Sequence, residues 1–332
     1  MKSRFILMIC VCAIAHPCFA ADQPAKNLPI KVFILAGQSN MEGQAVVDLD
    51  GKNYNGGKGT LKALLADPEK RKLVEHLRQV DGKWPTRDDV WVRYQREKGP
   101  LLAGPLGVGF AVYGGTHHFG PELQIGHVLG DHFDQQVLLI KTAWGGKNLC
   151  RDFRPPRSGG EVGPYYTKMI ADVRSTLKNL DKEFPDVQKQ GYELAGFVWY
   201  QGWNDGIDPK NAIPEYEQNL VNLIDDVRDE FQSPKLPIVV GELTGPWKDA
   251  PKAWEDLRQA QAAAAKRQKF RGNVAFVETR DFVRPAAESP NPSHGHHEFG
   301  NAETYFLVGD ALGKAMRDLC QRNDDSNTPS DR

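Results

Sequence analysis

Apolar runs of strand length alternate with longer amphipathic segments from residue 32 to residue 318. Continuous apolar runs are typical of strands buried on both faces of a parallel sheet, and the amphipathic segments have helical spacing. Strands that alternate with helices of this length favour an α/β fold, with a mostly parallel sheet covered by helices on both faces. The pattern predicts strands at 32–36, 137–140, 194–200, 237–242 and 273–278, and helices at about 118–133, 166–184, 215–231, 253–267 and 302–318.

Residues 44–118 depart from this alternation. They contain a glycine-rich stretch at 51–59, helical spacing at 61–77 and an alternating strand pattern at 90–94. We expect an insertion or lid on the side of the sheet where the first strand ends. Its aromatic side chains either stack on a ligand or pack a small core of the insertion; they are Trp84, Trp91 and Tyr94.

The first strand runs directly into Gly37-Gln38-Ser39-Asn40-Met41. Open α/β sheets bind ligands at the carboxyl ends of their strands, so Ser39 lies where chemistry is expected and is a candidate nucleophile. It can equally cap the following helix, since Ser and Asn are common N-cap residues. The stretch differs from the Gly-x-Ser-x-Gly elbow of the α/β-hydrolases because residue 41 is Met.

Two more strands end in polar turns that contain glycine. The strand at 137–140 is followed by Gly145 and Gly146, where a backbone N–H can point at a developing oxyanion or where the chain simply turns. The next strand is followed by Gly202-Trp203-Asn204-Asp205. The Asn204 amide is a neutral donor, which suits an oxyanion better than a group that titrates.

The loop before the last predicted helix contains His294, His296 and His297. A late histidine can reach a serine at the end of an early strand and act as general base and then general acid. Three close histidines also suggest a metal site. Gly295 and the lack of partner Cys or His clusters elsewhere disfavour a closed coordination shell.

The first 20 residues have the features of a secretory signal peptide. Lys2 and Arg4 precede an apolar stretch at 5–15, and Cys18-Phe19-Ala20 forms a small-x-small cleavage site. We therefore expect a secreted or periplasmic protein, cleaved near Ala20.

Composition and charge narrow the choice of partners. The net charge of −1 offers no basic face for nucleic acid and no polycationic patch for membranes. The length suffices for one large domain, which we expect at 28–320, followed by a disordered tail at 321–332. Outside the leader only Cys150 and Cys320 remain, either as one disulfide or as two free thiols.

Ser39, Gly146, Asn204 and a late histidine together resemble the SGNH hydrolase superfamily. Within it, residues 37–41 resemble the branch that includes the sialate O-acetylesterases and the acetylxylan esterases of carbohydrate esterase family six. The four blocks occur in the family's order, and the resemblance covers nearly all of the chain after the leader. It implies a flavodoxin-like three-layer fold and a serine esterase without metal or cofactor, whose partner is an acetylated carbohydrate.

The resemblance also implies roles for individual residues. Ser39 is the nucleophile, and its backbone N–H is one oxyanion donor. Gly146 supplies a second donor, with Gly145 as the alternative, and the Asn204 side chain supplies a third. His297 matches the family's histidine block because of its spacing to the final helix, which favours it over the two preceding histidines.

The residues next to these blocks are candidates for substrate binding. Two arginines in the loop after Gly146, Arg151 and Arg154, permit an acidic sugar, although this loop can equally be solvated. Aromatic side chains at two strand ends permit neutral xylan units. The candidates are Gln38, Trp144, Arg154, Gln201 and Trp203.

One departure from the family pattern concerns the acid that orients the histidine. The family commonly has Asp-x-x-His, but here the position three before His297 is His294. A backbone carbonyl, Asp205, Asp281 or Glu288 is a candidate replacement. A Ser-His dyad is workable without it, since loss of an orienting acid slows such chemistry without abolishing it.

Two other functions are compatible with the same blocks. One is an SGNH hydrolase that acts on lipid or thioester acyl groups, which requires a long apolar groove. The predicted insertion is too polar and glycine-rich to favour such a groove. The other is a carbohydrate-binding protein that has lost its chemistry, which the histidine at 294 suggests.

Overall fold

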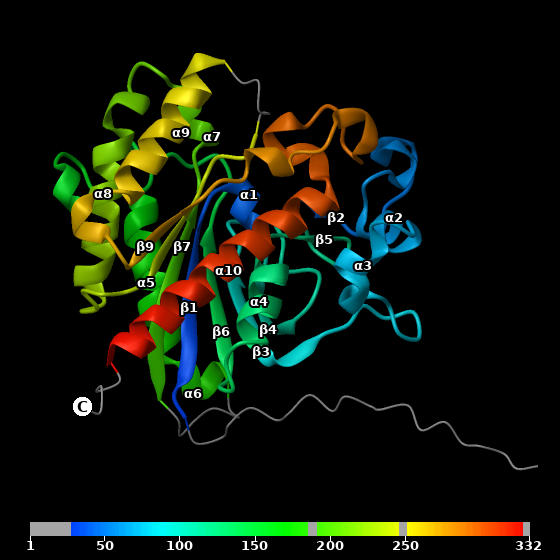
Figure 1. The fold of residues 1–332 in the computed structure, drawn as a ribbon, viewed down its shortest axis with the longest axis horizontal. Coiled ribbons are helices and arrows are strands. Elements are labelled where there is room, and N and C mark those ends of the chain that lie inside the picture. Colours follow the sequence, from blue (N-terminus) through cyan, green and yellow to red (C-terminus); the bar gives the residue numbers. More distant parts are fainter. Residues whose placement is uncertain (1–27, 185–190, 246–250, 328–332) are drawn as a thin grey trace, which may run out of the picture.

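The computed structural model describes residues 28–184, 191–245 and 251–327, so the predicted leader lies outside the described part. A central sheet has the strand order β4-β3-β6-β1-β7-β8-β9 (Figure 1). Neighbouring strands are parallel except β3 and β4. The strands are β1 (Ile30–Gly37), β3 (Arg87–Gln95), β4 (Leu101–Leu106), β6 (Val137–Ala143), β7 (Tyr192–Tyr200), β8 (Ile238–Gly241) and β9 (Val274–Val277), beside a small sheet of β2 (Ala45–Val46) and β5 (His118–Phe119).

Helices cover both faces of the sheet, which confirms the predicted α/β architecture. The helices α4 and α10 pack on one face, and α5, α8 and α9 pack on the other (Figure 1). The α-helices are α1 (Ser39–Glu42), α2 (Leu61–Ala66), α3 (Arg71–Val74), α4 (Glu122–Gly130), α5 (Pro164–Lys178), α6 (Leu180–Glu183), α7 (Trp203–Gly206), α8 (Ile213–Glu230), α9 (Lys252–Ala265) and α10 (Ala302–Asn327). Short 3-10 turns join them; they are η1 (Lys52–Gly57), η2 (Glu75–Leu77), η3 (Pro156–Ser158), η5 (Gln268–Phe270), η6 (Arg280–Phe282), η7 (Ala286–Glu288) and η8 (Gly295–Gly300).

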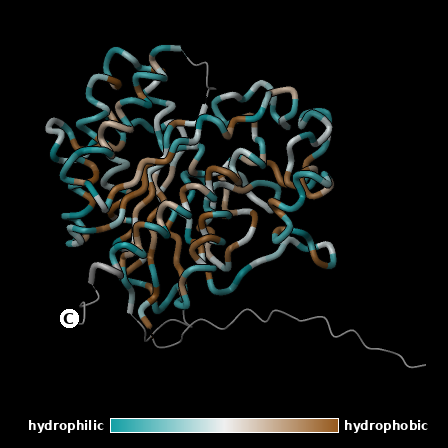
Figure 2. Tube along the Cα trace, viewed as in Figure 1, coloured by the Kyte–Doolittle hydropathy of each residue, from teal (hydrophilic) through white to brown (hydrophobic). Residues whose placement is uncertain are grey.

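Burial on both faces explains why the strands are continuous apolar runs. In β1, Phe33 and Leu35 belong to the core under α4 and α10, while Val32 and Ile34 belong to the core under α5, α8 and α9. Hydrophobic residues accordingly concentrate along the central strands (Figure 2). Successive side chains of a strand point to opposite faces, so a strand between two helical layers needs apolar residues at every position.

The segment 44–118 is only in part an insertion outside the sheet. Its strands β3 and β4 extend the main sheet, and β3 pairs in parallel with β6. The aromatic residues of the segment serve packing: Trp91 lies edge-on against Phe184, and Tyr94 is fully buried. The sequence did not reveal this, because a strand pattern does not specify its pairing partner.

Some helix boundaries differ from the predicted ones. The helical spacing at 61–77 gives α2, α3 and η2 in place of one helix, because Pro68 follows α2 and cannot continue it. The predicted helix 166–184 is divided into α5 and α6 at Asn179. The last helix continues through Asn327, which overlaps the predicted tail at 321–332.

The centre of the sheet is a topological switch point. The chain places β6 on one side of β1 and β7 on the other, so the ends of the three strands meet at one edge. Doubly wound sheets bind ligands at such points. At the end of β1, Gly37 has a φ of +156°, and a Cβ there would lie 2.1 Å from the carbonyl oxygen of Tyr200. Glycine therefore allows the chain to enter α1 beside β7.

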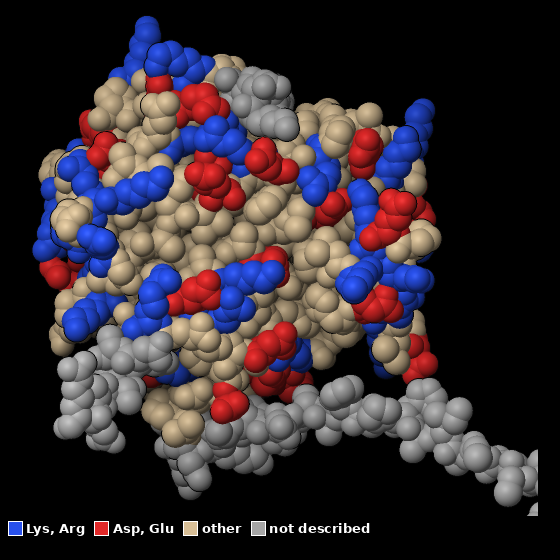
Figure 3. Space-filling model, viewed as in Figure 1, with Lys and Arg blue, Asp and Glu red and all other residues tan. Residues whose placement is uncertain are grey.

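The surface has no face of a single charge sign in the view of Figure 3, where basic and acidic side chains intermingle. None of the described helices has the length and apolar character needed to cross a membrane. Cys150 and Cys320 are both buried, and no disulfide joins them.

Candidate active site

Ser39 is the first residue of α1 and lies directly after β1. Ser39 is only 7% exposed, so it lies almost buried at the edge of the sheet where β1 ends. The preceding residue, Gln38, accepts hydrogen bonds at Oε1 from the backbone N–H groups of Gly202 (3.1 Å) and Asn204 (3.2 Å). These contacts bring the turn after β7 against the turn that carries the serine.

The Asn204 side chain is oriented by the same glutamine. Gln38 Nε2 donates to Asn204 Oδ1 over 3.1 Å, which turns the Nδ2 amide of Asn204 away from Gln38. Gln201 Nε2 donates to Gln38 Oε1 (3.2 Å) and to Asp205 Oδ2 (2.6 Å). Gln38 and Gln201, which the sequence suggested as substrate ligands, thus hold the site's framework together.

Asp205 is fully buried below this framework. Its carboxylate accepts hydrogen bonds from the backbone N–H groups of Leu149 and Cys150 as well as from Gln201. Burial raises the pKa of Asp205 to about 6, and these donors oppose the rise. The aspartate therefore ties the loop after β6 to the turn after β7.

The glycine pair after β6 lies beside the serine. A Cβ on Gly145 would lie 3.8 Å from the Cβ of Ser39 and 2.9 Å from Oε2 of Glu42. The Gly145 N–H is directed at the Glu42 carboxylate, whereas Gly146 has a φ of +73° and open space around its Cα. The N–H of Gly145 is engaged by Glu42, which favours Gly146 over Gly145 as a donor to a ligand.

Glu42 is part of a buried charged cluster under the glycine pair. Its Oε1 accepts a hydrogen bond from the hydroxyl of Tyr94 (2.7 Å), and burial raises its pKa. Lys141 Nζ donates to the Glu42 carbonyl oxygen (2.7 Å) and pairs with Glu122 (2.7 Å). Removal of one partner from such a buried pair leaves an uncompensated charge, so the cluster fixes α1 relative to β6.

His297 lies in a loop with an uncommon backbone. Glu298 and Phe299, which follow it, have φ values of +50° and +56°, although neither is glycine. Such conformations cost about 1–3 kcal/mol each and are concentrated at functional sites. The Tyr305 hydroxyl of α10 donates to Asn40 Oδ1 (2.7 Å) and to the His297 carbonyl oxygen (3.3 Å). The histidine loop is thereby joined to the residue that follows the serine.

The His297 ring is packed among aromatic groups. It lies 4.0 Å from the ring of His296, which in turn lies 5.8 Å from Trp203. Burial first, and then the charges of His296 and His294, lower the pKa of His297 to about 3. The ring is therefore neutral at pH 7 and able to accept a proton.

The described residues contain no hydrogen bond from the His297 ring to a carboxylate or to the Ser39 hydroxyl. Of the candidate acids, Asp205 is engaged as described above, and Asp281 and Glu288 lie at exposed positions. The structure thus brings the serine and histidine segments together without assigning an orienting acid.

Glu298 is a buried carboxyl group that the sequence analysis missed. Its Oε1 accepts hydrogen bonds from Asn40 Nδ2 (3.0 Å) and from the backbone N–H of Gly245 (2.9 Å). Its Oε2 is buried without a partner among the described residues. Burial raises the pKa of Glu298 to about 8. The side chain thus joins Asn40 of α1, 258 positions earlier in the sequence, to the segment after β8.

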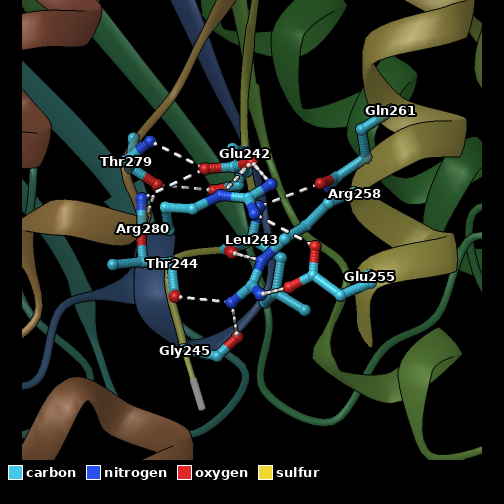
Figure 4. A network of polar contacts seen from close by, with 9 residues as sticks. All are labelled: Glu242, Leu243, Thr244, Gly245, Glu255, Arg258, Gln261, Thr279 and Arg280. Carbon is cyan, nitrogen blue, oxygen red and sulfur yellow. Dashed lines mark hydrogen bonds and ion pairs between the residues drawn. The ribbon is translucent and has the colours of Figure 1, made fainter. Parts of the chain in front are cut away.

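Gly245 is itself held by a polar network at the end of β8 (Figure 4). Arg258 of α9 donates to the carbonyl oxygens of Leu243, Thr244 and Gly245 and pairs with Glu255. The network continues to Arg280 and Glu242. No local motif marks these residues: Arg258 contacts carbonyl groups 13 to 15 positions earlier, and Glu242 contacts an arginine 38 positions later.

The other predicted ligand residues have structural contacts. Trp144 is fully buried, and its Nε1 donates to the carbonyl oxygen of Gln95. Arg154 binds three backbone carbonyl oxygens and Glu215. Trp203 remains partly exposed and lies edge-on against Trp254. In the described part of the chain, no three His, Cys, Asp or Glu side chains are grouped to hold a metal.

The fold is similar to that of several solved structures. A protein from Arabidopsis thaliana has a TM-score of 0.53 at 16% identity, over 87% of this chain and 98% of its own. XAC1771, a carbohydrate acetylesterase from Xanthomonas citri, has a TM-score of 0.52 at 14% identity, over 87% of this chain and 56% of its own. NanS has a TM-score of 0.51 at 13% identity, over 91% of this chain and 99% of its own.

A comparison with curated protein sequences gave no significant match. Residues 29–304, however, match the carbohydrate esterase family described as sialic acid-specific acetylesterases. This match spans the sheet from β1 to β9, the serine turn and the histidine loop. The chain therefore belongs to the sialic acid-specific acetylesterase family of carbohydrate esterases.

Proposed function

We propose that this carbohydrate esterase removes acetyl groups from sugar hydroxyls through an acyl-enzyme on Ser39. The observation that carries the proposal is the pair of contacts made by the Tyr305 hydroxyl, which join Asn40 beside the nucleophile to the backbone of His297. Hydrogen bonds between catalytic groups often form only when substrate is bound. The lack of a hydrogen bond between Ser39 and His297 in the described residues is therefore compatible with this role.

In the proposed reaction, His297 takes the proton of the Ser39 hydroxyl as the oxygen attacks the acetyl carbonyl. The tetrahedral oxyanion is stabilised by the backbone N–H groups of Ser39 and Gly146 and by Nδ2 of Asn204. Collapse of this intermediate breaks the ester bond, and His297 returns the proton to the sugar oxygen. Water then attacks the acyl-enzyme by the same route and releases acetate.

Acetate release from 4-nitrophenyl acetate and from acetylated xylan tests this proposal. Ser39→Ala and His297→Ala are expected to lose activity by several orders of magnitude. Ser175→Ala, an exposed serine on α5, is the matched control and should retain full activity. If His297→Ala stays active while His294→Ala does not, the catalytic histidine is assigned to the wrong position.

The acyl chain length tests the choice of acetate. The polar and glycine-rich sequence of residues 44–118 does not favour a long apolar groove, so we expect a short acyl group. A preference for 4-nitrophenyl octanoate over the acetate would instead indicate a lipase or thioesterase-like hydrolase.

We propose further that the protein is exported and that signal cleavage occurs near Ala20. The basic start and the apolar stretch of the leader support this. N-terminal sequencing of protein recovered from the periplasm or medium should begin at Ala21. Recovery of the full-length chain only in the cytoplasm would contradict the proposal.

A further inference from the structure

A pocket is formed by the segment that leads from β2 into η1. It has a volume of about 440 Å³, within the roughly 300–1,000 Å³ typical of ligand pockets, and is lined by residues 48–54 and His117.

The walls of this pocket are fixed by hydrogen bonds. Asn55, at a φ of +51°, donates from Nδ2 to the carbonyl oxygens of Ala287 (3.1 Å) and Ser289 (2.9 Å), which anchors η1. On another side of the pocket, His117 Nδ1 lies 2.6 Å from Asp48 Oδ1. A pocket that is shaped before binding loses less conformational entropy when a ligand enters.

The chain leads from the pocket to both halves of the candidate active site. The lining begins two residues after β2, and β2 begins three residues after the end of α1. Asn55, next to the lining, donates to carbonyl oxygens of the loop that precedes His297. The half-exposed Tyr113 lies within electrostatic reach of both regions. Burial raises the pKa of Tyr113, and the charges of Tyr54 and Glu42 raise it further.

The lining combines one aromatic ring with hydrogen-bonding groups. Tyr54 is partly exposed, and carboxylate, amide and imidazole groups surround it at Asp48, Asn53 and His117. An aromatic face beside such groups matches the apolar face and hydroxyl edge of a sugar ring. A long acyl chain would leave these polar groups without partners.

The lining has no excess of positive charge. Asp48 and Asp50 carry two carboxylates against the one ammonium group of Lys52. Lys62, outside the lining, lies 3.9 Å from the carboxylate of Asp50. A sugar that bears a carboxylate therefore gains no electrostatic attraction here.

We propose that this pocket is a binding subsite for an uncharged sugar ring of an acetylated oligosaccharide, a ring other than the one whose ester reacts at Ser39. The proposal rests on the esterase function proposed above and specifies its substrate as an oligosaccharide. Binding energy from such a remote ring would hold the reacting ester in place.

Kinetics with two substrates test the subsite. Tyr54→Ala is expected to raise KM for acetylated xylotetraose about fivefold to tenfold more than it raises KM for 4-nitrophenyl acetate. The smaller substrate cannot reach the pocket from Ser39. Asn53→Ala, at an exposed position, should show the same bias. The matched control is Tyr192→Ala, since this tyrosine is 47% exposed at the opposite end of β7 and should affect neither substrate. An equal effect of Tyr54→Ala on both substrates, or none on either, would overturn the proposal.

Binding without turnover separates the subsite from the proposed chemistry. Calorimetric titration of Ser39→Ala with unacetylated xylotetraose should give a dissociation constant that Tyr54→Ala weakens by a similar factor. Sialyllactose should bind more weakly than xylotetraose; equal affinity for the two would overturn the assignment to uncharged sugars. A wild-type protein that releases no acetate would overturn the esterase mechanism, whereas the titration would still decide the subsite.

Discussion

At the residue scale, the site combines a neutral histidine with a buried acid that does not touch its ring. The pKa of His297 is lowered by burial and by neighbouring histidines, and no carboxylate among the described residues raises it. Glu298 instead binds Asn40 and Gly245. The acid next to the histidine in sequence therefore positions backbone and amide groups, while the ring relies on packing against His296.

The lowered pKa of His297 predicts an acid-tolerant activity. A general base works only in its neutral form, and a pKa of about 3 keeps the ring neutral well below pH 6. For 4-nitrophenyl acetate, kcat/KM should therefore show no inflection near pH 6.5 on its acid side. Circular dichroism at each pH is the control, because a histidine with a depressed folded pKa costs stability as the pH falls below 6.5. An inflection near 6.5 in folded protein would contradict the prediction.

The raised pKa of Glu298 predicts a loss of stability as the pH rises from about 4.5 to about 8. A carboxyl group with a pKa of about 8 in the folded state binds its proton more tightly there than in the unfolded chain. The folded state thus loses about 1.4 kcal/mol per pH unit from this group between these two values. Glu298→Gln should flatten the dependence of Tm on pH between about 5 and 8, as measured by thermal unfolding. Glu288→Gln, at an exposed position, should leave the wild-type slope unchanged; a parallel curve for Glu298→Gln would refute the prediction.

At the scale of elements, loops after three neighbouring strands are tied to one another by side chains. Gln38 after β1 binds the turn after β7, and Asp205 after β7 binds the loop after β6. The segment after β8 joins them through the hydrogen bond between Gly245 and Glu298. Each strand end is therefore positioned by its neighbours, as a site built from separate loops requires.

Arg258 carries the link from α9 to the segment after β8. Its side chain is fully buried and donates to backbone carbonyl oxygens there (Figure 4). Arg258→Ala leaves these carbonyl acceptors unsatisfied and removes one of the two arginine partners of Glu255, the other being Arg280. Unfolding in urea should therefore show a loss of about 3 kcal/mol or more. Arg267→Ala, whose side chain is 48% exposed, is the control and should change stability by less than about 0.5 kcal/mol. A similar small change for both variants would show that the network contributes little.

At the scale of the whole molecule, the two helical layers keep the cysteines apart. Cys150 lies near Asn211 at the end of the sheet that carries the site, and its thiol donates to the Asn211 carbonyl oxygen. Cys320 on α10 donates to the carbonyl oxygen of Ala195 in β7. Both residues are less than a tenth exposed.

Thiol labelling of the mature protein checks this arrangement. Both cysteines should react with a chromogenic disulfide reagent in guanidinium chloride without prior reduction, and slowly in the native protein. A reducing agent should leave Tm unchanged, because it has no disulfide to break. Labelling that appears only after reduction would contradict the structure, in which no disulfide joins the two cysteines.

Much of the fold was predictable, because local periodicity and burial are linked in a doubly wound sheet. The strand at 194–200 and the helix at 215–231 were recognisable from hydrophobic spacing alone, and they are observed as β7 and α8. The pairing of β3 with β6 was not predictable. A strand pattern shows whether one or both faces of the strand are buried, but not which strand lies beside it. No clear local signal in the sequence marks the break between α5 and α6 at Asn179.

The order of the blocks around Ser39, Gly146, Asn204 and His297 was determined by the sequence, because each follows a recognisable strand or precedes a helix. For the same reason, the family could be recognised from the sequence. Only the tertiary structure decided which side chains meet. The contacts of Glu298 with Asn40 and of Gln38 with Asn204 join residues far apart in the chain. Arg258 meets the segment after β8 because α9 packs beside it. Hydrophobic periodicity is a local property, whereas buried polar contacts depend on how distant elements pack, and no spacing along the chain encodes them.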